Sequence, residues 1–512
     1  MHPFLERYGD DVFGILNGFD RVRLRGTLRW LAHTRGMQSF LNAFGVPLTD
    51  FGSYVEDVTT QVKQATEAVC TTAGRPLQYL TRSDESKDQL ARAMATRDGI
   101  QTGVICTFKT VEACWSYDIH RNRAARRLEL VGCWRKCLHY YHYLVHPTFG
   151  FAYLRLQSWF PFTVHVGLNG REWLARQMDA AHLAYRRREN CFVWIADLAA
   201  AQQLADRQLT TRWDAVLTAL VRQLHPAHAA IFGGSPAHYY WSMEHSEWAS
   251  DVLFRTPAAL AALYPQWLLH GMQHVRSRDV MRYLGKPVTP TETGVHGRFA
   301  GEVVSDLRER REGVRLKHRV KENWLKMYDK QGSVLRIETV LNDPRDLRVY
   351  RAAEGAPGGS KAWRRLRKGV ADVQRRAELS RQANERYLAT LAAIDVHEPL
   401  GTLTQAVCRR VRWHGRSVRA MNPLAVADSA LLEAIARGEY ILHGFRNRDL
   451  VRVGTARSPA AVTQQLRMLR AHELIRKVPR THRYLLTDRG RVVVMAILAA
   501  RQADTTTLMK AA

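Results

Sequence analysis

The sequence lacks the features that would place it in a membrane or outside the cell. Its longest late apolar run, from Val492 to Ala500, is about half of a membrane span. The N-terminal MHPFLERYGDD has neither a basic segment nor an apolar segment of the kind that directs secretion. Seven cysteines in 512 residues are few and odd in number, which argues against a disulfide framework. These absences predict a cytoplasmic protein without a membrane partner.

Catalytic sequence motifs are also missing. The chain has no Walker loop, no Gly-x-Ser-x-Gly elbow and no His-Glu-x-x-His helix. Cys133, Cys137, His139 and His142 lie close together, but their spacing is unusual for zinc. On a strand, His142 would also point away from Cys137 and His139. We therefore predict no metal site there, and no motif implies a cofactor.

What the chain has in excess is positive charge. It contains 76 Lys and Arg against 48 Asp and Glu, a net charge of +28, and 63 of the cations are arginine. Residues 301–512 carry 42 of the cations and 22 of the acids, so +20 of the charge lies there. A GC-rich genome would also enrich arginine, but arginine is the cation that binds phosphate and guanine in pairs of hydrogen bonds. The excess therefore predicts a polyanionic partner, with nucleic acid first.

Length and punctuation divide the chain. A chain of 512 residues predicts two to four domains of roughly 100–200 residues each. Pro/Gly-rich stretches at 286–294 and 354–360 mark boundaries. We predict a multidomain α+β protein whose four parts are a mixed α/β portion (1–300), a β-hairpin region that completes its sheet (301–352), a linker with a long basic helix (353–400) and a C-terminal domain (401–512).

The first 300 residues predict an antiparallel sheet with helices. Runs typical of strands occur at 21–28 and 103–109, and aromatic strands flank a Pro/Gly turn between 138 and 168. Helices are expected over 171–188, after the Thr256-Pro257 cap, and over 277–285.

One of these strands alternates aromatic and polar side chains. Alternation places on one face Phe151, Tyr153, Arg155, Gln157 and Trp159. Such a face can stack single-stranded bases, which keeps an RNA-binding role open. The favoured interpretation is a sheet packed on both sides, because the intervening residues are apolar as well.

Residues 313–350 predict three short strands, at 314–320, 324–328 and 334–341. The segment from Lys326 to Lys330, Lys-Met-Tyr-Asp-Lys, is followed by Leu-Arg-Ile-Glu ending at Glu338. These residues resemble a segment of the replication initiators of rolling-circle plasmids and filamentous phage.

That resemblance implies a nuclease that forms a tyrosyl–DNA bond. Tyr328 or Tyr350 would be the nucleophile, and Asp329 and Glu338 would hold Mg²⁺ or Mn²⁺. The alternative, which we favour, is a solvent-facing hairpin whose Lys, Arg and Glu side chains pair across the strands.

Beyond the linker, helix-forming residues predict one long helix from Ser360 to about Ile394. Five cations fall between Lys361 and Lys368, near the expected N-terminus. Positive charge there opposes the helix dipole, so either phosphate contact or a solvated surface must favour it.

The C-terminal part has the clearest pattern. Helices are expected over 429–437 and 446–451, and Ser458-Pro459 opens a third in the preferred capping arrangement. Val462, Leu466 and Leu469 are spaced for a buried stripe on that helix. Residues 474–487 predict two short strands joined by a basic tip, and 491–500 predict a closing helix.

This order resembles the winged helix-turn-helix of bacterial regulators of the MarR and ArsR type. The resemblance implies a recognition helix in the major groove of DNA and a wing on the minor-groove backbone. The implied groove contacts are Ser458, Thr463, Gln464, Arg467 and Arg470. The implied wing contacts are Arg476, Lys477, Arg480, His482 and Arg483. By analogy with such regulators, a homodimer is also expected.

Three functions stay open at this point. The leading one is a protein that binds duplex DNA through the C-terminal domain, with an N-terminal portion of unknown chemistry. A DNA-nicking enzyme of replication or mobile elements, using a tyrosine and a divalent metal, is the enzymatic alternative. RNA binding is the third, since winged helices also bind RNA or dock on proteins.

Overall fold

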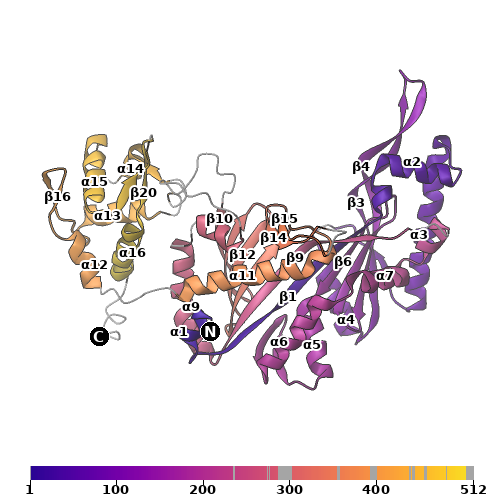
Figure 1. Cartoon of the computed structure of the whole chain (residues 1–512), viewed down its shortest axis with the longest axis horizontal. Coiled ribbons are helices and arrows are strands. Elements are labelled where there is room, and N and C mark those ends of the chain that lie inside the picture. Colours follow the sequence, from indigo (N-terminus) through magenta and orange to yellow (C-terminus); the bar gives the residue numbers. More distant parts are fainter. Residues whose placement is uncertain are drawn as a thin grey trace.

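The fold is known from a computed structural model (Figure 1). It describes the chain except for residues 1, 83, 234–236, 274, 276, 286–302, 354–357, 393–399, 438–439, 441–443, 455–457, 480 and 503–512. The two Pro/Gly-rich boundaries predicted from the sequence therefore lie wholly or partly outside the described residues. Helices and strands both contribute, so the chain is α+β as predicted. Within the described ranges, no helix combines the length and the apolarity needed to cross a membrane.

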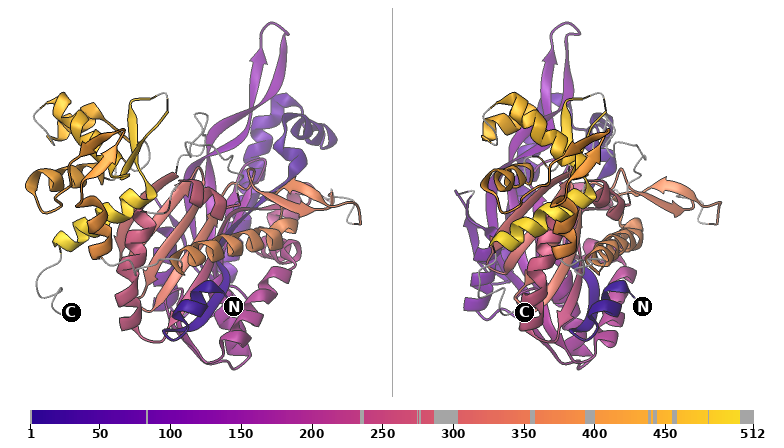
Figure 2. Two further views of the ribbon diagram at one scale, coloured as in Figure 1. Left: turned by 60° about the vertical axis from the view of Figure 1, so that its left-hand side comes forward. Right: turned by 90° about the vertical axis from the view of Figure 1, so that its left-hand side faces the viewer.

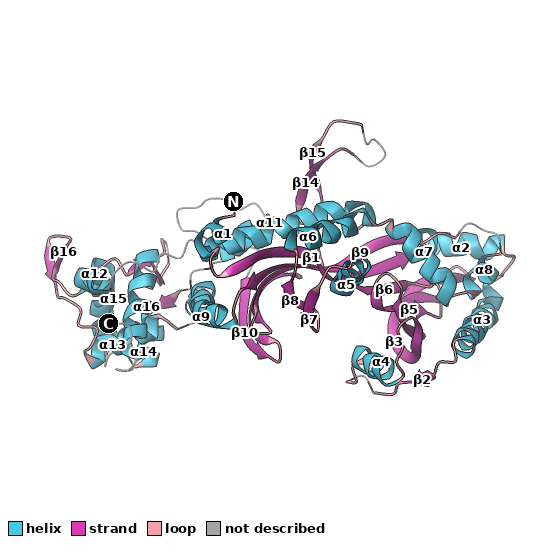
Figure 3. Ribbon diagram, turned by 90° about the horizontal axis from the view of Figure 1, so that it is seen from below, coloured by secondary structure: helices cyan, strands magenta, loops and turns pink. Residues whose placement is uncertain are grey.

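A sheet of 11 strands runs through the described part of the molecule, with the order β10-β11-β12-β13-β9-β1-β6-β5-β4-β3-β2. Figure 3 shows it as a curved layer with helices on both sides. All neighbours are antiparallel except β2 and β3. The strands are β1 (Val12–Thr27), β2 (Leu77–Tyr79), β3 (Gly103–Asn122), β4 (Arg127–His146), β5 (Gly150–Gln157), β6 (Val164–Asn169), β9 (Tyr240–Phe254), β10 (Val303–Arg310), β11 (Gly313–Val320), β12 (Asn323–Lys330) and β13 (Val334–Leu341).

The centre of the sheet joins distant parts of the sequence. Strand β9 pairs with β1 on one side and with β13 on the other. All eight residues of β13 are buried, so both faces of this strand are covered. Strands near the N-terminus, near residue 250 and near residue 340 therefore share one hydrogen-bonded layer.

Helices pack on the sheet in two main apolar clusters. One surrounds β1, β4, β5 and β6 and includes α2 (Thr34–Ala43), α3 (Phe51–Thr72), α5 (Gly170–Ala180), α6 (Leu198–Arg207), α7 (Trp213–Leu224) and α8 (Ala227–Phe232). The other covers β9 and β11 to β13 with α1 (Pro3–Tyr8), α9 (Pro257–Gln273), α10 (Ser277–Tyr283) and α11 (Val373–Ala392). A smaller cluster packs α4 (Lys87–Arg97) against β3, β4 and β5.

The C-terminal elements have an apolar core of their own. Three short strands form a sheet in the order β18-β20-β19. The elements of this C-terminal unit are α12 (Leu400–Val407), β16 (Val411–Trp413), β17 (Arg416–Val418), α13 (Val426–Ile435), β18 (Phe445–Arg446), α14 (Asn447–Val453), α15 (Pro459–Ala471), β19 (Ile475–Lys477), β20 (Arg483–Leu486) and α16 (Asp488–Gln502).

The prediction of one helix from Ser360 to Ile394 is wrong at its start. Residues 362–365 form β15 (Ala362–Arg365), which pairs with β14 (Arg348–Arg351), and helix α11 begins only at Val373. Strand pairing here overrides the local helix propensity. The five cations between Lys361 and Lys368 therefore lie on a hairpin and the turn after it, and they do not oppose a helix dipole.

The helix predicted over 171–188 is too long for the same kind of reason. Helix α5 ends at Ala180, and His182 has a left-handed φ of 53°. The chain then enters β7 (Tyr185–Arg188), which pairs with β8 (Cys191–Ile195). The helices predicted after Thr256-Pro257 and from Ser277, and the strands predicted between 314 and 341, are confirmed with small shifts of their ends.

Candidate functional sites

Helix α15 presents polar side chains at the surface of the C-terminal unit. Ser458 caps it by accepting a hydrogen bond from the Ala461 N–H at 3.2 Å, and Pro459 occupies the first turn. The stripe predicted for this helix is buried, as are two neighbouring side chains: Val462, Leu466, Met468, Leu469 and His472. Three predicted contact residues are exposed: Thr463, Gln464 and Arg467.

Two of the predicted contact residues on α15 already have partners. Thr463 Oγ1 donates to the Pro459 carbonyl and accepts from Asn447 Nδ2 at 2.9 Å, which ties α15 to α14. The Arg470 guanidinium lies 4.9 Å from the centre of the Trp413 ring. These contacts orient the helix, and they leave Gln464 and Arg467 as its more available polar side chains.

The strand pair β19–β20 carries the predicted wing contacts. Lys477 and His482 are exposed, and Arg476 and Arg483 are half-buried. Arg480 lies outside the described residues. The turn between the strands is held by the Val478 N–H, which donates to the Arg483 carbonyl at 2.9 Å.

A basic hairpin beside α15 was missed in the sequence. Strands β16 and β17 lie against α15 and form with it a hollow of about 480 Å³, lined by Trp413, Arg416, Arg419, Gln464, Arg467 and Met468. Four arginines of the hairpin and its first flank are exposed: Arg409, Arg410, Arg412 and Arg416. The run of arginines around Trp413-His-Gly415 is the signal that could have predicted it.

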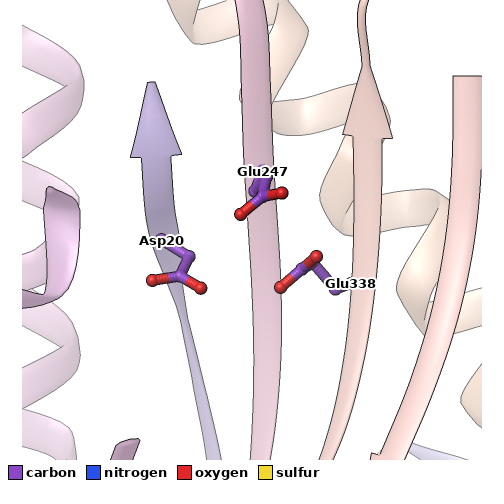
Figure 4. Close-up of side chains that lie close together, drawn as sticks. All are labelled: Asp20, Glu247 and Glu338. Atoms are coloured by element: carbon purple, nitrogen blue, oxygen red, sulfur yellow. The ribbon is translucent and has the colours of Figure 1, made fainter. Parts of the chain in front are cut away.

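Three carboxylates meet on one face at the centre of the sheet. Asp20 comes from β1, Glu247 from β9 and Glu338 from β13, and Figure 4 shows them pointing toward one another. One oxygen from each lies within 4.8 Å of the others, and all three side chains are buried. Carboxylate oxygens are the ligands that Mg²⁺ and Mn²⁺ prefer. Among the described residues, this is the group with a spacing that suits a metal ion.

Basic side chains enter the same cluster. Lys326 Nζ lies 3.2 Å from Glu247 Oε1 and 2.5 Å from Glu338 Oε1. Arg21 Nε lies 2.8 Å from Glu247 Oε2. The carboxylates are therefore already paired with cations across strands β1, β9, β12 and β13.

A second group of ion pairs extends the cluster. Arg336 spans Asp20 at 3.0 Å and Asp251 at 2.6 Å, and Arg171 lies 2.9 Å from Asp251. We call the whole set the buried charge network, formed by Asp20, Arg21, Arg171, Glu247, Asp251, Lys326, Arg336 and Glu338. Its four carboxylates face four cations, so the network is balanced in charge.

The network shifts the pKa values of its members in different directions. Burial opposes ionisation of Glu247, but Lys326 and Arg21, with a hydrogen bond from His245, hold its pKa well below the usual range. Burial, with the nearby Glu247, raises the pKa of Glu338 despite Lys326. The two carboxyl groups that share Lys326 thus differ in their ease of protonation.

The residues predicted for tyrosine chemistry do not lie together. Tyr328 is on the same face of the sheet as Glu338, and burial together with that carboxylate raises its pKa to about 12. Asp329 lies on the opposite face and accepts a hydrogen bond from the Val314 N–H, because neighbours on a strand alternate. Tyr350 lies on β14 and contacts Trp363. Of the predicted metal ligands, the structure thus brings only Glu338 to the carboxylate cluster.

The predicted hairpin is also not solvent-facing at its centre. Lys326, Arg336 and Glu338 are all buried, since β13 is an inner strand of the sheet. The expected pairing of Lys326 with Glu338 is present, but it takes place inside the protein.

A groove of about 280 Å³ opens beside Glu247. It is lined by arginines of β1 and α4 and by rings of β5, among them Arg21, Arg23, Arg92, Phe151 and Tyr153. The Tyr153 ring lies across Gly167, where a Cβ would come within 2.1 Å of it. The aromatic strand is therefore covered at Phe151, whose ring Arg92 overlies at 3.8 Å, and more open at Tyr153.

The cysteine and histidine cluster lies within β4. His142 hydrogen-bonds Thr107 at 3.0 Å, and His139 contacts the Cys137 carbonyl at 3.1 Å. Both rings are buried, and burial lowers the pKa of each to about 4. Alternation directs His142 to the opposite face from Cys137 and His139, as expected from the sequence.

Sequence reasoning missed Asp20 and Glu247. They are separated by more than 200 residues and meet only because β9 inserts between β1 and β13. The available signal was acidic residues inside otherwise apolar strand-like segments, which are rarely buried unless paired.

Comparison of the chain with protein-family models, with curated protein sequences and with solved structures finds no match in any of the three. The argument for function therefore depends on the sites themselves.

Proposed function

We propose that the protein binds duplex DNA through its C-terminal unit, with α13 to α16 and β18 to β20 acting as a winged helix. The observation that carries this proposal is the order helix, strand, helix, helix, strand pair, helix, with the strands paired as β18-β20-β19. In winged helices the third helix enters the major groove, and here that helix is α15.

The distribution of side chains supports the same role. Gln464 and Arg467 project from α15, and Lys477 and His482 lie exposed on the adjoining strand pair. Long basic side chains contact phosphates and fix the position of the protein, whereas Gln and Arg read base edges. Ser458, Thr463 and Arg470 position the helix, and Arg476, Arg480 and Arg483 add positive charge to the strand pair.

The test is a binding titration on the full chain with a fluorescent 30-base-pair duplex, a single-stranded DNA and an RNA hairpin. The double variant Arg467→Ala/Lys477→Ala should weaken duplex binding at least tenfold, at roughly 1–3 kcal/mol for a lost base contact plus a lost phosphate contact. The matched control, Arg35→Ala/Arg207→Ala, removes the same charge from exposed positions on the helical side of the sheet and should leave binding unchanged.

Two outcomes would overturn this proposal. Equal loss of affinity in the control variant would mean that only overall charge matters. Tighter binding of the RNA hairpin than of the duplex would assign the protein to RNA instead.

A second candidate function is metal-dependent cleavage of a nucleic-acid strand at the carboxylate cluster. The specific observation in its favour is the convergence of Asp20, Glu247 and Glu338 within 4.8 Å, beside a groove lined with arginines. A divalent ion held there would stabilise charge that develops on a phosphodiester. Since Lys326 now lies between two of the carboxylates, an ion would have to displace its ammonium group.

Incubation of supercoiled and single-stranded DNA with the protein and Mn²⁺ tests this candidate. Nicking that is lost in Glu338→Gln and kept in Asp329→Asn would support it, since Asp329 lies on the other face of the sheet. A covalent protein–DNA adduct lost in Tyr328→Phe would add the tyrosine step. No product with any substrate would leave the cluster with a structural role.

A further inference from the structure

Strands β3 and β4 extend beyond the rest of the sheet. Strand β2 pairs with β3 only as far as Lys109, and β5 pairs with β4 only from His139 onward. Between these points, residues 111–122 and 127–138 have each other as their only strand partners among the described residues. We call residues 111–138 the ribbon; Figures 1 and 2 show its end projecting past the neighbouring helices.

The base of the ribbon is fixed to the protein. Tyr117 donates to the Leu31 carbonyl at 2.6 Å, and Ser116 donates to the Phe160 carbonyl at 2.6 Å. Tyr117 and Leu130 are buried in the main apolar cluster. An isolated two-stranded hairpin is marginal in water, so these anchors account for the ordered position of the tip beyond them.

The tip is strongly basic. Four arginines fall within seven residues and all are exposed: Arg121, Arg123, Arg126 and Arg127. Arg127 pairs with Glu129 at 2.9 Å, whereas the other three have no ion pair or hydrogen bond to the described residues. Like charges concentrated at the end of a projecting element repel one another, and a polyanion would relieve that repulsion.

Two tryptophans flank this charge. Trp134 is 72% exposed, and Trp115 lies beside it with a distance of 6.3 Å between the ring centres. The Trp115 ring lies across Gly132, where a Cβ would come within 2.4 Å of it. An exposed pair of large aromatic side chains is unusual on a surface without a partner.

We propose that the ribbon is a second DNA-binding element, whose tip arginines contact the phosphates of duplex DNA. The major groove is about 12 Å wide and admits a two-stranded β-ribbon. Contacts of this kind give affinity without sequence preference. This proposal rests on nucleic acid being the partner of the chain, but it does not depend on the C-terminal unit.

The test compares the salt dependence of duplex binding by the full chain and by Arg121→Ala/Arg123→Ala/Arg126→Ala. Loss of three phosphate contacts should lower the slope of log K against log salt by roughly 2.7, at about 0.9 per contact. The matched control, Arg35→Ala/Arg207→Ala/Arg212→Ala, removes the same charge from other exposed positions and should keep the full slope. An unchanged slope in the ribbon variant would overturn the proposal.

Trp134→Ala gives an independent readout. It should weaken binding severalfold and leave the slope unchanged, because an uncharged contact releases no counterions. Unaltered affinity would remove Trp134 from the interface, and with it the aromatic part of the proposal.

Two further arms separate this proposal from others. If Arg467→Ala/Lys477→Ala leaves binding intact while the ribbon variant weakens it, the C-terminal proposal fails and the ribbon proposal stands. Sedimentation with vesicles of phosphatidylserine and phosphatidylcholine tests an anionic membrane. Vesicle binding that the ribbon variant loses, with DNA binding unaffected, would overturn the proposal.

Discussion

The centre of the sheet and the C-terminal unit use the same basic residues in opposite ways. In the buried charge network, Arg171 and Arg336 are fully buried and each meets a carboxylate. In the C-terminal unit, Arg467 and Lys477 are exposed and have no ion pair to the described residues. A buried cation must be neutralised within the fold, whereas an exposed cation is available to a partner.

This contrast gives meaning to the net charge of +28. The buried charge network is balanced, so it adds nothing to the field outside the protein. The excess therefore resides on exposed elements, such as the ribbon tip, the β16–β17 hairpin and α15 with its neighbouring strands. A total charge predicts a polyanion, and burial tells which surfaces can meet it.

The largest expected effect breaks the network from within. Arg336→Leu leaves Asp20 and Asp251 buried with fewer partners and should lower the free energy of unfolding by roughly 3–5 kcal/mol. Urea denaturation monitored by circular dichroism measures it. Arg345→Ala, which removes an exposed pair with Asp343, should cost less than about 1 kcal/mol. Equal costs for the two variants would remove the distinction drawn above.

Acid should destabilise the sheet through its buried histidines. Burial lowers the pKa of His142 to about 4, below its ordinary value of 6.5, so the folded state favours the neutral ring. Because the unfolded chain takes up the proton first, stability is lost as pH falls from about 6.5 to 4. The loss should reach roughly 3 kcal/mol at pH 4, at 1.36 kcal/mol per unit.

The control for this prediction is His142→Gln, which cannot be protonated. Its unfolding free energy should fall less steeply than that of the wild type over the same pH range. Parallel curves for the two proteins would contradict a buried neutral His142.

A smaller effect is expected at the start of α15. Ser458→Ala removes the cap on the Ala461 N–H and should cost about 1 kcal/mol. Hydrogen exchange should place this loss in the C-terminal unit, which has a core of its own, and leave the amides of the sheet protected. Ser458→Asn, another good capping residue, should restore stability.

Local elements were predictable where the sequence carries local signals. The cap at Ser458-Pro459, the cap at Thr256-Pro257 and the alternation from 314 to 341 are each contained within a few residues. Strand β9 was not predicted, since Glu244, Glu247 and Asp251 interrupt its apolar pattern. The hairpin at 362–365 was not predicted either, because its partner strand lies on the far side of a Gly/Pro-rich stretch.

The candidate sites divide in the same way. The contact residues of the C-terminal unit follow one another along 25 residues, and a family resemblance could indicate them. The carboxylate cluster depends on the register of three strands that are distant in sequence, and only Glu338 had been predicted as a ligand. Asp329 was assigned to the same site because it is near in sequence, although the alternation of strand β12 places it on the other face.

The salt dependence of duplex binding tests the central claim most directly. The account predicts that Arg467→Ala/Lys477→Ala leaves the free energy of unfolding within about 0.5 kcal/mol of the wild type. It also predicts a slope of log K against log salt lower by up to roughly 1.8, for two lost phosphate contacts. A wild-type slope and wild-type affinity in this variant would contradict the claim that the C-terminal unit binds DNA.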